Sequence, residues 1–147
     1  MMVWWILLAV ALTALLLWAY FTAQRLNRLH IRTDAALASL QAALDRRAAV
    51  VAALLPEVRA VAVAAEEVPL VHGDVDKRIS RERDLSRALS PLELPPQLID
   101  AEVRVQLAHR FYNDAVADTR ALRLRPLVRS LRLGGTAPLP EFFEYRT

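Results

Sequence analysis

The sequence predicts an all-α protein in which an N-terminal transmembrane helix continues into an antiparallel three-helix bundle. Three observations support this fold class. Residues 3–23 form an apolar run without a charged side chain, and apolar residues then recur at helical spacing in two long stretches, residues 26–62 and 98–122. No stretch shows the alternation of a half-buried strand. About 120 residues follow the run, enough for one small domain at residues 24–133.

The apolar run at residues 3–23 has the length and flanks of a membrane span. As a helix it is about 31 Å long, and a bilayer core is about 30 Å thick. Trp4 and Trp5 stand near one end and Trp18 and Tyr20 near the other, where aromatic rings favour the headgroup level. A cleaved signal peptide is the alternative. It is disfavoured because the run is long and these bulky rings occupy the place of a small-residue cleavage site.

Charge predicts the orientation and excludes some functions. Arg25, Arg28 and Arg32 follow the run, so the positive-inside rule predicts a cytoplasmic C-terminal domain. The chain has 19 basic and 16 acidic residues and no cysteine. This mixed surface does not suggest nucleic-acid binding. The lack of cysteine excludes disulfides, thiolate metal sites and a cysteine nucleophile.

The first long helix is expected to run from the membrane into the domain without a break. Residues 24–67 contain no glycine and a single proline, Pro56, which should kink the helix because it removes a backbone donor. One face carries small or apolar residues: Leu26, Leu29, Thr33, Leu37, Leu40, Leu44, Val51, Leu55, Val58 and Ala62.

A short charged helix follows a connection at residues 68–76. Asp74 or Asp76 can cap it, and it should extend from about Asp76 to Leu89. Its apolar side is thin, and it consists of Val75, Ile79, Leu85 or Ser86, and Leu89. Prolines at 91, 95 and 96 must then leave the helix.

The third helix, about Pro96 to Arg125, has the clearest pattern. Its apolar and small residues alternate spacings of three and four, as in a heptad seam: Leu98, Ala101, Val105, Ala108, Tyr112, Ala115, Thr119 and Leu122. We expect Val103, Leu107, Phe111 and Val116 to widen this seam into a core-facing surface that packs on the first helix.

The C-terminal region has two parts. Residues 126–133, PLVRSLRL, set leucines against arginines. We interpret them as a cap on the bundle, with binding to an anionic membrane leaflet as the alternative. Residues 134–147 form an extended tail in which Phe142, Phe143 and Tyr145 could dock onto their own bundle or onto a partner.

Several blocks of the chain resemble the LemA family. Residues 32–62 match its first helix at Asp34, Ala36, Leu40, Leu44, Arg46, Arg47, Leu54, Leu55 and Pro56. Residues 101–122 match its second motif at Glu102, Ala108, Arg110, Tyr112, Asn113, Ala115 and Val116, and the final PEFFE is similar to the family's ending. The sequence departs from the family in its shorter, proline-broken middle helix. The resemblance implies a bacterial, membrane-anchored antiparallel helical bundle and no particular activity or cofactor.

The motif arginines have two interpretations. Arg46 with Arg47, and Arg110 with Asp114, can pair with a carboxylate or amide of a facing helix and so fix its register, with Tyr112 and Asn113 as possible partners. They can also be ordinary surface charge. A buried pair of this kind sets specificity more than stability.

No residue pattern suggests catalysis or a cofactor. His72, Asp74 and Asp76 form H-x-D-x-D, for which capping and loop polarity are favoured over a metal site. His30 and Asp34 stand at i and i+4, where a local hydrogen bond is expected. We therefore expect no catalytic residue, no metal and no cofactor.

The sequence favours a non-enzymatic protein interaction or scaffold module, single-pass in the bacterial cell membrane. Its expected partners are the lipid bilayer, a membrane or cytoplasmic protein, and a second copy of itself as a homo-oligomer. The alternative is an accessory single-span subunit of a larger membrane complex. In that case the span itself is the interface, through its small residues Ala9, Ala11, Thr13 and Ala14.

Overall fold

The computed structural model describes residues 1–144, and all the regular structure within them is helical. The elements in order are α1 (Met2–Leu54), the 3₁₀ turn η1 (Pro56–Val58), α2 (Arg59–Glu66), α3 (Val75–Leu89), α4 (Pro96–Arg123) and α5 (Pro126–Ser130). The predicted all-α chain with a long N-terminal apolar helix is confirmed.

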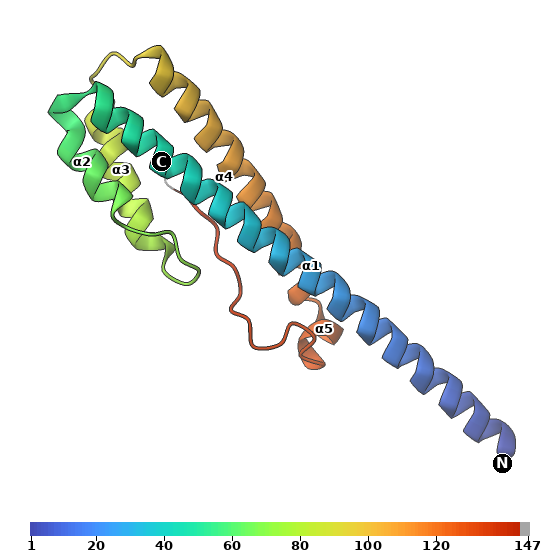
Figure 1. The fold of residues 1–147 in the computed structure, drawn as a ribbon. Coiled ribbons are helices and arrows are strands. Elements are labelled where there is room, and N and C mark those ends of the chain that lie inside the picture. The colour runs from blue at the N-terminus through green and yellow to red at the C-terminus, as the bar shows by residue number, and fades with distance from the viewer. Residues whose placement is uncertain (145–147) are drawn as a thin grey trace.

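Helix α1 is far longer than any other element, and only its C-terminal part packs against the other helices. Its 53 residues span about 80 Å, and its N-terminal part projects alone beyond the other helices (Figure 1). The most apolar window of 18 residues is long and apolar enough to cross a membrane, and none of its residues is buried. This exposure rules out the core helix of a soluble domain and leaves a membrane span or a signal sequence.

The C-terminal part of α1 is the central strut of the domain. Its first buried residue is Leu26, and α4 runs back alongside it (Figure 1). All eight seam residues of α4 predicted from the spacing, from Leu98 to Leu122, are buried. The helical stripe predicted on α1 is likewise buried from Thr33 to Val51.

The outer surface of α4 differs from the prediction. Val103, Leu107 and Phe111 are more than half exposed, whereas Val116 is buried as expected. Among the described residues, α4 has α1 on one side and the tail beside it, and no further helix covers its outer face. The wide apolar stripe was therefore wrongly assigned to the core.

Pro56 reverses the chain instead of kinking one long helix. Helix α1 ends at Leu54, and Leu55 is extended with φ −125° and ψ 82°. The residue before a proline disfavours the helical region, whereas proline itself suits the first position of the next helical turn. Helix α2 then lies back beside the end of α1, and α3 packs on α2 (Figure 1).

Candidate functional site

A network of buried charges lies where α1, α3 and α4 meet. Arg47 of α1 and Arg78 and Glu82 of α3 are each at most 1% exposed. Glu82 accepts hydrogen bonds on both oxygens, from Arg47 Nη1 at 3.0 Å and from Arg78 Nε at 2.8 Å. Arg78 Nη1 also donates to the carbonyl of Val68 at 2.8 Å and lies 2.9 Å from Asp45 Oδ1. One carboxylate thus joins two buried guanidiniums.

Arg47 extends the network to the other elements. Its Nε lies 2.7 Å from Glu102 Oε1 of α4, and its Nη2 donates to Ser86 Oγ of α3 at 3.1 Å. A single guanidinium therefore links α1 to both α3 and α4. Planar guanidinium groups suit this role because their donors point in fixed directions.

The pKa of the Glu82 carboxyl is set by its buried site between two arginines. Burial raises the pKa of this carboxyl, while the guanidiniums of Arg78 and Arg47 act against that rise. Both of its oxygens are already engaged by arginines, and the Ser86 hydroxyl accepts from Arg47. The arrangement positions helices relative to one another, because Arg47 of α1 pairs with residues of α3 and α4 and Arg78 of α3 pairs with Asp45 of α1.

The C-terminal tail is fastened to α4 by a second polar cluster. Phe143 is fully buried and packs in the same core cluster as Leu40, Leu44 and Tyr112. Asn113 meets its backbone from both sides: Phe143 N donates to Asn113 Oδ1 at 3.0 Å, and Asn113 Nδ2 donates to Phe143 O at 3.3 Å. His109 Nε2 also hydrogen-bonds to Phe143 O. These contacts pin one residue of the tail to one turn of α4.

Further contacts hold the three residues before Phe143. Tyr112 donates to the carbonyl of Glu141 at 2.6 Å, and burial raises the pKa of this phenol to about 12, so it stays a neutral donor. Arg120 donates to the carbonyl of Pro140 at 2.9 Å, and its guanidinium lies 5.7 Å from the ring centre of Phe142. Phe142 remains 40% exposed. Tyr145, the third residue of the expected tail element, lies outside the described residues.

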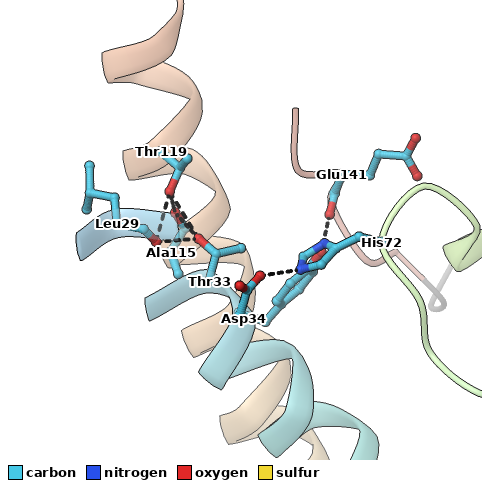
Figure 2. Close-up of polar contacts among 8 residues, drawn as sticks. Leu29, Thr33, Asp34, His72, Ala115, Thr119 and Glu141 are labelled. Atoms are coloured by element: carbon cyan, nitrogen blue, oxygen red, sulfur yellow. Dashed lines mark hydrogen bonds and ion pairs between the residues drawn. The ribbon is translucent and has the colours of Figure 1, made fainter. Parts of the chain in front are cut away.

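The polar residues of the loop before α3 have other partners than the sequence indicated. Asp34 pairs with His72 Nε2 at 2.8 Å (Figure 2) and not with His30, whose Nε2 is buried without a hydrogen-bond partner. Asp74 occupies the N-cap position of α3 but makes no capping bond. Its side chain pairs with Lys77 at 2.8 Å instead. Within residues 1–144, no group of three or more His, Asp or Glu side chains is placed to hold a metal ion.

The residues singled out by the LemA-like motifs divide into two groups. Arg47 and Glu102 meet in the ion network, whereas Tyr112 and Asn113 hold the tail and do not contact the motif arginines. Pro56 lies at the chain reversal. Arg46 and Arg110 are exposed on the surface.

Sequence reasoning missed Arg78 and Glu82. The predicted apolar side of this helix did not include them, yet both are buried together with Val75, Ile79 and Leu85. The indication was present in the spacing. Position 82 is where the three–four alternation of apolar residues requires a buried side chain, and position 78 stands four residues before it.

No family model, no curated protein and no solved structure matches the chain. The function must therefore be argued from the geometry.

Proposed function

We propose that this protein is a single-pass, membrane-anchored helical module that acts by binding another protein and not by catalysis. Residues 3–23 serve as the anchor, and the arginines that follow them hold the domain on the cytoplasmic side of a bacterial membrane. The domain itself is an antiparallel three-helix bundle of the LemA type. Within this bundle, Arg47 pairs with Glu102 of α4, and Asn113 hydrogen-bonds to the backbone of Phe143 in the tail.

The observation that carries the proposal is an apolar ridge on the outer face of α4. We define the outer ridge as Ile99, Val103, Leu107 and Phe111, which are 51%, 58%, 53% and 55% exposed. Residues four apart form one continuous row on a helix surface, and such rows pack into the grooves of a second helix. The ridge is about 18 Å long. It is a surface built to receive a helix.

A hollow continues the outer ridge at its N-terminal end. It has a volume of about 370 Å³ and is lined by Ile99 and Val103 together with Leu92 and Leu94 of the preceding loop. Arg47 and Glu102 of the ion network also border it. An apolar side chain of the partner fits this hollow, with the network fixing the position of its walls.

The proposed occupant is an amphipathic helix of a partner anchored in the same membrane. Helix α4 runs alongside α1 (Figure 1), and α1 carries the anchor, so the outer ridge follows the axis of the span. A partner helix that rises from the membrane meets the ridge lengthwise. Helix-in-groove recognition of this kind is read by apolar residues at i, i+4 and i+7.

The test compares charge substitutions on and off the ridge in the full-length, membrane-inserted protein. Leu107→Glu and Phe111→Glu place a carboxylate on the ridge, and Ala117→Glu places one on an exposed site of the same helix outside it. After crosslinking in cells, the yield of the crosslinked adduct between the protein and its partner should fall at least tenfold in the ridge variants. It should be unchanged in Ala117→Glu. Equal loss in all three variants, or no loss on the ridge, contradicts the proposal. An adduct of twice the chain mass identifies a second copy as the occupant.

The alternative function is an accessory subunit that binds through its span. No residue in the apolar window of α1 is buried within the chain, so this window is available to a second helix. Ala9, Ala11 and Ala14 permit close helix packing in the bilayer. Replacing residues 3–23 with an unrelated span separates the two. Loss of the adduct points to the span, and its retention points to the outer ridge.

A further inference from the structure

The end of the domain nearest the apolar run is strongly basic. Residues 1–33 and 119–140 contain eight of the chain's 19 basic residues and none of its 16 acidic residues. The structure brings these two segments together, because Leu26 of α1, Leu122 of α4 and Val128 of α5 form one small core cluster. Positive charge is thus concentrated where α1 leaves the domain.

An apolar hollow of about 340 Å³ lies between α1 and α5 at this end. Trp18 and Thr22 line it from α1, and Leu122, Leu127 and Val128 line it from the other side. Trp18 belongs to the apolar run, so the hollow opens at the height of the membrane surface. Leu127 is 63% exposed and extends the apolar lining outward.

Val128 also lines a basic hollow of about 450 Å³. Arg123, Arg129 and Arg132 line it together with Gly134, and no acidic residue does. Arg123 Nη1 is buried without a hydrogen-bond partner. A Cβ atom at position 134 would lie 2.9 Å from Arg123 Nε, so glycine leaves this guanidinium room.

We propose that the two hollows together bind an anionic phospholipid of the leaflet from which α1 emerges. An acyl chain lies in the apolar hollow against Trp18 and Leu127, and the lipid phosphate accepts hydrogen bonds from Arg123, Arg129 and Arg132. Guanidinium groups bind phosphate oxygens in pairs of hydrogen bonds. Residues of α5 line both hollows, one apolar and one basic, and this pair matches the two ends of a lipid molecule. The inference rests on the membrane anchoring proposed above.

The experiment measures lipid retention by native mass spectrometry of the full-length protein. The protein is extracted from vesicles of phosphatidylcholine mixed with phosphatidylglycerol. The wild type should retain phosphatidylglycerol at least tenfold over phosphatidylcholine. The combined variant Arg123→Gln, Arg129→Gln, Arg132→Gln should lose that preference. A matched variant, Arg81→Gln, Arg104→Gln, Arg110→Gln, removes three exposed arginines elsewhere and should keep it.

Three outcomes overturn the inference. They are equal retention of the two lipids by the wild type, equal loss in the two triple variants, and displacement of the lipid by inorganic phosphate at low concentration, which would identify a free-anion site. Extraction of membranes with alkaline carbonate distinguishes a failure of the anchoring itself. If the protein stays in the membrane after carbonate extraction but shows no lipid preference, only the lipid site is disproved. If carbonate releases the protein, the membrane anchor is disproved.

Discussion

Helix α1 is held against the domain in two different ways at two positions along its axis, which we call the first height, at Thr33, and the second height, at Arg47. Nearer the apolar run, Thr33 of α1 faces Thr119 of α4, with 3.0 Å between their hydroxyl oxygens (Figure 2). Each hydroxyl also lies 2.9 Å from a carbonyl of its own helix, Thr33 from that of Leu29 and Thr119 from that of Ala115, so its single proton has an acceptor within the helix. Four turns further along, Arg47 is held by charged residues of α3 and α4.

The two heights differ in what each polar group needs from another element. The threonine hydroxyls are satisfied by carbonyls of their own helices, so the contact between them is replaceable. The charges around Arg47 depend on side chains from other helices, and removing one leaves the others buried without full compensation. Buried polar groups therefore constrain the packing of α1 weakly near Thr33 and strongly near Arg47.

The largest expected effect comes from breaking the ion network at its centre. Glu82→Leu leaves Arg47 and Arg78 buried without their shared carboxylate, and we expect a loss of about 3–5 kcal/mol in the free energy of unfolding. Chemical unfolding in detergent, followed by circular dichroism, measures it. The combined variant Arg47→Met, Arg78→Met, Glu82→Leu should recover part of this loss. A single variant as stable as the wild type would remove the contrast between the two heights.

The next prediction concerns whether the part of the domain near Thr33 and the part near Arg47 unfold in a single transition. Phe143 lies in the core cluster between them, and Phe143→Ala should cost about 3 kcal/mol, in the range seen for buried phenylalanines. Phe142→Ala, at the adjacent and 40% exposed position, is the matched control and should cost under about 1 kcal/mol. Two separate transitions in the Phe143→Ala variant would show that the tail couples the two heights. Equal losses in the two variants would contradict the burial of Phe143.

The smaller effect concerns the threonine height. Thr33→Val and Thr119→Val together replace both hydroxyls with methyl groups of similar shape, and such paired replacements are nearly neutral. We expect a change within about 1 kcal/mol in the same unfolding measurement. A loss as large as that of Glu82→Leu would mean that the hydroxyl pair, too, depends on the contact between helices.

The pattern along α4 and its packing on α1 were predictable from the sequence, whereas contacts that join three elements were not. The seam from Leu98 to Leu122 follows from spacing alone, because it reflects a single helix in contact with a single neighbour. The exposure of Leu107 was not predictable, since the width of an apolar stripe does not say how many neighbours cover it. The burial of Glu82 depends on Arg78 of its own helix and also on Arg47 of α1, which only the fold brings to it.

The tail illustrates the same limit. The sequence showed an aromatic segment able to dock but did not specify where, because the surface that receives Phe143 combines residues of α1, α3 and α4. Asn113, which the LemA-like motif pointed out, binds the Phe143 backbone. The side chain of Asn113 and the backbone that it binds are thirty residues apart in the chain, so its partner was not predictable from spacing.

The smallest expected effect is a pH dependence at the first height. His30 lies one turn before Thr33 and Asp34, and its pKa is lowered, mainly by burial and then by the charge of Arg123, with a smaller contribution from His72 and an opposing one from Asp34. The folded protein therefore binds this proton more weakly than the unfolded chain. Its contribution to stability is present above the unfolded value near 6.5 and is lost as the pH falls below that value.

The role of Arg123 can be separated from that of burial. Arg123→Gln should raise the pKa of His30 only in part, because burial is the larger cause. Titration of the imidazole by NMR measures the change, with His30→Asn identifying the signal. An unchanged pKa would show that burial alone acts on His30. A binding of anionic lipid at Arg123 should shift the pKa of His30 in the same upward direction as the substitution, so one titration links the packing of α1 to the basic hollow beside it.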